Sequence, residues 1–97
     1  MSTLADFSIV PMGKGEGIST YVARAVSIIR DSGLPYSLNP MGTSIEGEYD
    51  EVMDVVRKCF DAMQKDCDRV YMTIKLDYRR GIADRMQRKI RSVEAKL

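Results

Sequence analysis

This 97-residue chain contains no histidine, so its acid–base and nucleophilic chemistry would rest mainly on carboxylates, lysines, arginines and two cysteines. The chain therefore lacks histidine metal ligands and the usual histidine general base or nucleophile activator. A catalytic site would have to use Glu46, Lys75, Asp77 or a cysteine, and no pair of these has the spacing of a known catalytic motif. We therefore predict no enzyme activity, no metal site and no cofactor.

Two stretches have a composition that can hold an anion. The sequence Gly13-Lys14-Gly15-Glu16-Gly17 has G-x-G-x-G spacing, which matches neither the dinucleotide-binding nor the P-loop fingerprint. It is either a flexible connection or a backbone cradle for an anion before a helix. Arg79 and Arg80 end the last predicted strand, where paired arginines either bind a carboxylate or phosphate or are simply solvated.

The hydrophobic periodicity divides the chain into seven elements. Strands are predicted at residues 3–10, 36–39, 42–47 and 70–77, where apolar side chains alternate or turn residues bound a short run. Apolar side chains recur at helical spacing from residue 18 to 31 and from 49 to 63. A third helix is predicted after Gly81 to the end of the chain, with one stripe made of Ile82, Met86, Ile90, Val93 and Leu97.

This order, βαββαβ with an added C-terminal helix, predicts an α+β fold of the ferredoxin-like kind. Two right-handed crossovers, interleaved, give a four-stranded antiparallel sheet with two helices on one face. The expected order across the sheet is fourth, first, third and second strand. At 97 residues and 44% hydrophobic composition, residues 1–97 are expected to form a single domain.

Polar side chains gather on the face of the sheet that the helices leave uncovered. Period-2 geometry places Ser8, Ser44, Glu46, Lys75 and Asp77 on this face. It is either a solvated sheet face or a surface covered by a ligand or a partner subunit. Glutamate is a poor strand former, so Glu46 in a short strand requires a reason.

The last strand has no proline and lies at an edge of the predicted sheet, which favours pairing with another chain. The alternative is that the C-terminal helix covers this edge. We expect a homo-oligomer, because a small domain with an exposed edge gains core by association.

Composition argues against several other partners. The formal net charge is +1, and the central strands do not present the aromatic side chains that stack on bases, so we expect no nucleic acid. No apolar run approaches the ~20 residues of a membrane span, and the N-terminus does not resemble a signal peptide. The two cysteines, Cys59 and Cys67, are either buried free thiols, which the sequence favours, or a disulfide. Free thiols fit a reducing compartment, so a cytoplasmic location is expected.

Several stretches, in order, resemble the thiamine-binding protein family, small proteins related to hydroxymethylpyrimidine- and thiamine-binding proteins. They cover nearly the whole chain, and the most specific is Gly42-Thr43-Ser44-Ile45-Glu46-Gly47; the others are residues 8–13, 21–23, 68–71 and 77–80. The resemblance implies a ferredoxin-like fold assembled into dimers or tetramers. It also implies binding of thiamine or its pyrimidine moiety without catalysis.

The resemblance places ligand contacts at Thr43 and Glu46, with Ser44 beside them. A carboxylate with hydroxyl groups matches the amino group and ring nitrogens of an aminopyrimidine, and Glu46 opposes the charge of a thiazolium. Ser8, Lys75 and Asp77 complete the predicted ligand-binding set on the same sheet face. Thr43 has the parity of inward-facing Ile45, so it reaches a ligand only if the end of the strand is bulged or the pocket lies at the rim of the sheet. The alternative is a regulatory or structural oligomerisation module whose polar sheet face is a subunit interface.

Overall fold

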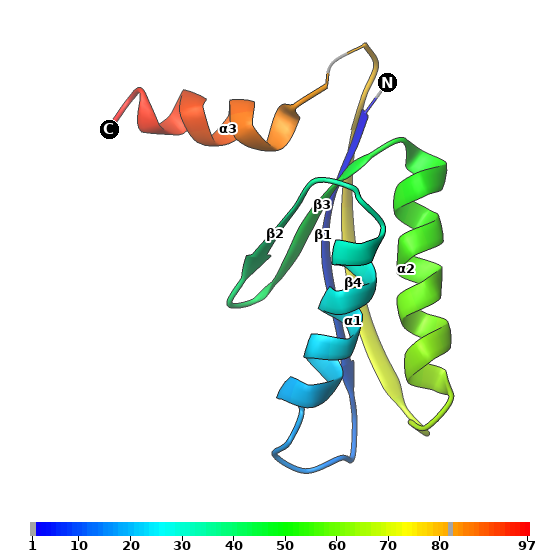
Figure 1. Ribbon diagram of the computed structural model, residues 1–97. Coiled ribbons are helices and arrows are strands. Elements are labelled where there is room, and N and C mark those ends of the chain that lie inside the picture. Colours follow the sequence, from blue (N-terminus) through cyan, green and yellow to red (C-terminus); the bar gives the residue numbers. More distant parts are fainter. Residues whose placement is uncertain (1, 82) are drawn as a thin grey trace.

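The computed structural model describes residues 2–81 and 83–97 and shows one sheet with two helices packed on it and a third helix projecting to the side (Figure 1). The elements follow the predicted order: β1 Ser2–Pro11, α1 Ser19–Asp31, β2 Tyr36–Asn39, β3 Gly42–Gly47, α2 Tyr49–Gln64, β4 Val70–Arg79 and α3 Arg85–Glu94. The last helix begins at Arg85 and is shorter than predicted. Ile82, expected at the head of its apolar stripe, lies outside the described residues.

The strands pair in the order β2-β3-β1-β4, and every neighbouring pair is antiparallel. Both helices of the crossovers, α1 and α2, cover the same face of the sheet (Figure 1). The predicted α+β, ferredoxin-like fold and its strand order are therefore confirmed.

The core lies between this face and the two helices. Phe7 of β1, Ile29 of α1, Ile45 of β3 and Met63 of α2 are each at most 2% exposed. Cys59 sits among them as a free thiol, and burial raises its pKa to about 11. A buried, protonated thiol of this kind behaves as a small apolar side chain.

The two helices cover the central strands of the sheet more completely than they cover β4. Met72 and Leu76 pair with Ile9 and Ala5 of β1, so they point to the face that α1 and α2 cover. They nevertheless remain 37% and 41% exposed, because β4 forms an edge of the sheet and the two helices contact it less than they contact β1. The edge strand thus leaves apolar surface in contact with solvent.

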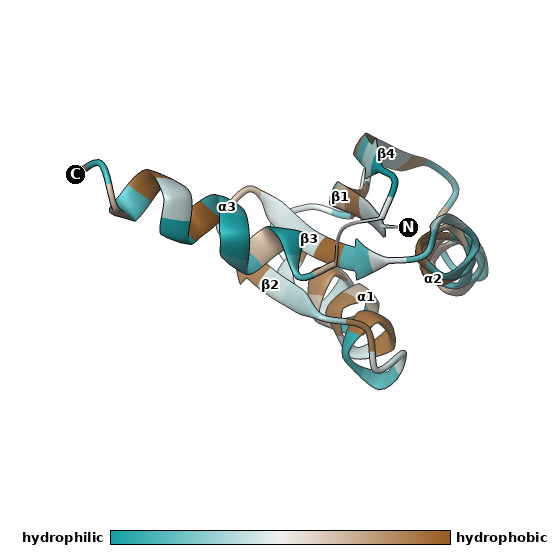
Figure 2. Cartoon of the chain, turned by 90° about the horizontal axis from the view of Figure 1, so that it is seen from above, coloured by the Kyte–Doolittle hydropathy of each residue, from teal (hydrophilic) through white to brown (hydrophobic). Residues whose placement is uncertain are grey.

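The third helix projects away from the rest of the chain, and its apolar residues form bands along its surface (Figure 2). Only Arg85 and Met86, in its first turn, are buried. The radius of gyration is 14.3 Å, against about 12.5 Å for a compact domain of this length, which reflects this projection. No helix of the described chain has the length and apolar character needed to cross a membrane.

Candidate functional site

The two central strands differ in length, and this difference opens a gap beside β1. β1 pairs with β4 over all ten of its residues, but with β3 only from Thr3 to Phe7. The β2–β3 hairpin turns at residues 39–42, so the side of residues 8–11 that faces away from β4 has no strand partner in the described structure. Main-chain N–H and C=O groups on such an edge are available to another partner.

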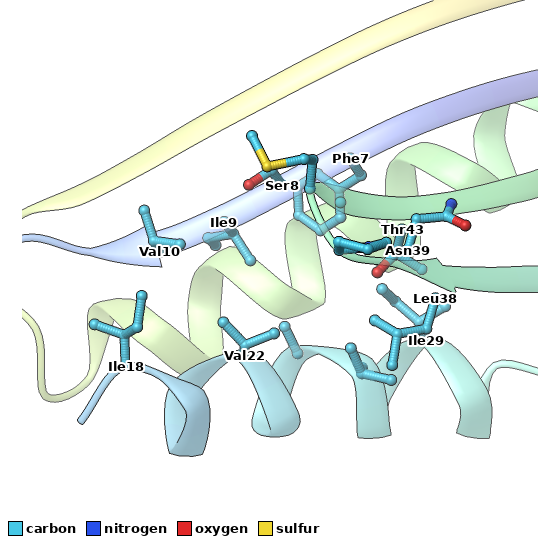
Figure 3. A pocket seen from close by; sticks show the side chains of 15 residues that line it. Phe7, Ser8, Ile9, Val10, Ile18, Val22, Ile29, Leu38, Asn39 and Thr43 are labelled. Carbon is cyan, nitrogen blue, oxygen red and sulfur yellow. The ribbon is translucent and has the colours of Figure 1, made fainter. Parts of the chain in front are cut away.

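Helix α1 passes below this gap and closes it into a cleft of about 370 Å³, which we call the α1 cleft. Figure 3 shows Ile18, the N-cap of α1, and Val22 of α1 facing Ile9 and Val10 of β1 across the opening. The walls are mostly apolar, and they include Phe7, Ile9, Val10, Ile18, Val22 and Leu38. The cleft can therefore desolvate a flat ring.

Three polar side chains also line the cleft: Ser8, Asn39 and Thr43. Thr43 is 5% exposed and points to the helix side, as its parity predicts. Asn39 Nδ2 donates to the carbonyl of Ser37 and to Ser44 Oγ, each at 3.3 Å. Within the described residues the lining carries no charge. The arrangement suits a planar heterocycle whose edge forms hydrogen bonds.

A second, polar hollow of about 360 Å³ lies on the face of the sheet that α1 and α2 leave uncovered, which we call the helix-free face although the first turn of α3 reaches it. Its lining includes Asp6, Ser44, Lys75, Asp77 and Lys89. The polar hollow and the α1 cleft share residues 39, 41 and 42 of the hairpin turn, so they adjoin there. Gly42 allows this close packing, since a Cβ at this position would lie 3.0 Å from the Phe7 carbonyl and 3.1 Å from Asp6 Oδ1.

Glu46 has a structural partner on the helix-free face. Its Oε2 accepts the backbone N–H of Arg85 at 2.8 Å, and its Oε1 accepts the backbone N–H of Met86 at 3.0 Å. These are first-turn donors of α3 that no intrahelical acceptor satisfies. A carboxylate is favoured there by the helix dipole as well. Glu46 is 6% exposed beneath α3 and holds this helix to the sheet.

Asp77 fixes the same helix through its side chain. Lys89 Nζ lies 2.8 Å from Asp77 Oδ2, and the Arg85 guanidinium contacts the same oxygen and donates to the Asp77 carbonyl at 2.8 Å. Hydrogen bonds from Lys89 and from Arg85 lower the pKa of Asp77 below its ordinary value. Asp77 therefore stays ionised and bound to α3 at neutral pH.

The six predicted ligand-binding residues thus lie in three places. Thr43 lines the α1 cleft, and Ser8 lines both the cleft and an adjoining part of the helix-free face. Ser44, Lys75 and Asp77 line the polar hollow, while Glu46 holds α3. The predicted ligand-binding set did not include Asn39, which the alternation of the second strand places on the polar face, or the apolar wall from α1. The sequence did contain a signal for the cleft. The predicted first strand has eight residues, whereas the strands of the hairpin are much shorter and leave the end of the first strand unpaired.

The sequence profile of the family described as thiamine-binding protein matches residues 5–94. The chain belongs to the thiamine-binding protein family. It is 43% identical to a UPF0045 protein of Mycobacterium bovis over 95 residues, which is 97% of this chain and 93% of that protein. It is also 35% identical to a UPF0045 protein of Methanothermobacter thermautotrophicus over 96 residues, 96% of this chain and 97% of that protein.

Two solved structures have the same fold. The hypothetical protein MJ1052 of Methanocaldococcus jannaschii superposes with a TM-score of 0.88 at 31% identity, covering 96% of each chain. A Thermotoga maritima protein, provisionally described as a thiamine biosynthesis/salvage protein, superposes with a TM-score of 0.81 at 23% identity over 94% of this chain and 99% of that one. The second likeness, at this identity, concerns the fold alone.

Proposed function

We propose that this member of the thiamine-binding protein family binds thiamine or its hydroxymethylpyrimidine moiety in the α1 cleft and performs no chemistry on it. The observation that carries the proposal is an apolar cleft beside an unpaired strand edge. Its volume of about 370 Å³ falls within the range of roughly 300–1,000 Å³ typical of small-molecule sites. The lack of histidine in the sequence supports binding without catalysis.

The chemistry of the cleft matches an aminopyrimidine. Ile9 and Val22 offer apolar walls for the ring, and the main-chain N–H and C=O of Ile9, which face away from β4, offer a donor and an acceptor to its edge. Ser8 and Thr43 add hydroxyl groups at the rim of the site. In this proposal Glu46 acts indirectly, by positioning α3.

The polar hollow supplies what the uncharged cleft lacks for thiamine. Thiazolium carries a positive charge, and Asp6 lies beyond the turn at Gly42, close to the cleft. We propose that Asp6 faces this cation, with Ser44, Lys75 and Asp77 forming the rest of the polar surroundings. The neutral pyrimidine has no such charge for Asp6 to oppose.

Titration calorimetry with thiamine and with hydroxymethylpyrimidine tests both parts of the proposal. Val22→Lys places a charge in the cleft and is expected to abolish binding of both compounds, whereas the control Val93→Lys alters an exposed valine of α3 and leaves it unchanged. Asp6→Asn is expected to weaken thiamine about tenfold and the neutral pyrimidine little. Absence of heat with either compound at millimolar concentration contradicts the proposal.

A second candidate function, an oligomerisation module, is favoured by exposed apolar surface on β4 and α3. Ile90 and Val93 are 46% and 60% exposed on a helix that touches the rest of the chain mainly through its first turn. β4 offers a ten-residue edge without proline. We propose a homo-oligomer, and a mass that does not depend on thiamine or pyrimidine would favour the module over the binder.

A further inference from the structure

The near-neutral net charge conceals a strong asymmetry along the chain. Residues 79–97 contain seven Lys and Arg against two Asp and Glu, a net charge of +5. Residues 1–78 contain eight against twelve, a net charge of −4. The positive charge is therefore concentrated at the end of β4 and on α3, where it creates a local field that attracts anions.

The fold gathers part of this charge around a hollow of about 420 Å³, which we call the basic hollow. Its lining consists of Arg79 from β4 and four residues of α3, namely Arg85, Arg88, Lys89 and Ser92. Arg88, Lys89 and Ser92 follow Arg85 by three, four and seven residues, so all four share one face of the helix. The lining therefore combines four cations with one hydroxyl donor.

Only part of this charge is neutralised within the chain. Asp77 accepts the ion pairs of both Arg85 and Lys89. In the described ranges 2–81 and 83–97, neither Arg79 nor Arg88 has an ion-pair partner. The guanidinium groups of Arg79 and Arg88 and the hydroxyl of Ser92 thus line the hollow, and neither guanidinium is paired with a carboxylate of the described residues.

The support beneath the hollow is rigid. The Arg85 side chain is 6% exposed, and Glu46 binds the backbone N–H groups of Arg85 and Met86. The first turn of α3 is therefore anchored to the sheet by two independent carboxylates, Glu46 and Asp77. A preorganised set of donors loses little conformational entropy when it binds a ligand.

We propose that the basic hollow is a second binding site, which takes the phosphate group of a small phosphorylated molecule. Arginine forks match phosphate oxygens in pairs, and Ser92 can donate to a third oxygen. The described lining of the hollow contains no aromatic side chain to stack on a base. These features favour a small phosphate ester or diphosphate over a nucleic acid strand. The site is distinct from the α1 cleft and does not depend on what binds there.

Inorganic pyrophosphate, titrated calorimetrically at low ionic strength, is the probe for this site. Arg88→Gln and Arg79→Gln are each expected to weaken its binding about tenfold, as for loss of a charge-assisted hydrogen bond. Arg57→Gln is the matched control, since it removes one positive charge from α2 while leaving the hollow intact. All three variants alter exposed arginines, so equal thermal unfolding temperatures are expected.

Two results would overturn the inference. The first is pyrophosphate affinity that falls equally in Arg57→Gln and Arg88→Gln, or no measurable binding by the parent chain at millimolar concentration. The second is a single-stranded oligonucleotide that binds more tightly than pyrophosphate and depends on the same arginines. Loss of thiamine binding in the Val22→Lys variant with pyrophosphate binding retained would show that the two sites are separate.

Discussion

Glu46 illustrates how a residue can look like a ligand contact in the sequence and meet a helix in the structure. It lies in the most specific segment of the family resemblance, and its carboxylate is the chemical group that an aminopyrimidine would select. In the fold, both of its oxygens bind α3, 39 and 40 residues further along the chain. Cutting this link is the most direct way to learn what α3 contributes.

Glu46→Ala should release α3 from the sheet. The change leaves two buried N–H groups without acceptors, which costs about 2–4 kcal/mol. Hydrogen exchange at Arg85 and Met86 should accelerate strongly, with a smaller effect in Glu46→Gln, which keeps one carbonyl acceptor. Unchanged exchange in the alanine variant would show that Glu46 does not hold the helix. If α3 is released, the pyrophosphate affinity should fall as well.

The pair between Arg24 and Asp66 makes a pH prediction. The Arg24 guanidinium donates to both carboxylate oxygens, at 2.8 and 3.0 Å, and this hydrogen bonding lowers the Asp66 pKa from 3.8 to about 2. Because the folded pKa lies below the unfolded one, the pair stabilises the fold above about pH 4. That contribution is lost as the pH falls toward 2.

Carboxyl NMR titration checks this value directly. In the parent chain Asp66 should titrate with a pKa near 2, and in Arg24→Gln its pKa should return toward 3.8. The acid dependence of unfolding should shrink accordingly in the variant. A pKa for Asp66 that is the same with and without Arg24 would refute the assignment.

At the scale of elements, the site depends on the short β2–β3 hairpin ending before β1 does. Four further residues of β1 run past the last pair, Phe7 with Thr43, and α1 lies below them. The turn packs closely enough that Gly42 touches β1 and separates the cleft from the polar hollow. The geometry of this turn should therefore affect both stability and binding.

Gly42→Ala tests that dependence. The added Cβ would meet the Phe7 carbonyl at 3.0 Å, a backbone atom that cannot rotate away, so the hairpin must shift. We expect a loss of about 1–3 kcal/mol in the free energy of unfolding, together with weaker thiamine binding. Gly17→Ala is the control, because nothing lies within 4 Å of its Cβ. Equal denaturation midpoints for the two variants would contradict the prediction.

At the scale of the whole molecule, the dimensions of 42 × 31 × 20 Å and the projecting α3 describe a chain that is extended for its length. Apolar side chains stay exposed on α3 and at the edge formed by β4. Covering such surface is the usual driving force for association. The shape of the chain therefore agrees with the proposed homo-oligomer.

Light scattering on the eluted protein should give a mass that is a multiple of 11.0 kDa. Met72→Pro, in the middle of β4, should reduce the mass if the edge pairs with a second copy, since the register directs the Met72 N–H away from β1 and proline removes that donor and blocks strand addition. Ile90→Lys should do so if the stripe of α3 is the contact. A monomeric parent chain at micromolar concentration would overturn the proposal.

The sequence alone determined the element order, the antiparallel topology and the faces of the strands. These follow from local periodicity and from the handedness of two crossovers, and the structure confirms them. The sequence also contains the signal for the basic segment at residues 79–97, which an overall net charge of +1 hides.

Only the tertiary structure decided which side chains meet. Glu46 and Arg85, or Arg24 and Asp66, are about 40 residues apart, and no local pattern links them. The α1 cleft arises from strand register and from where α1 crosses the sheet, and both are set by packing between distant elements. For the same reason, the polar face read from the sequence divides into a helix anchor, a polar hollow and the rim of an apolar cleft.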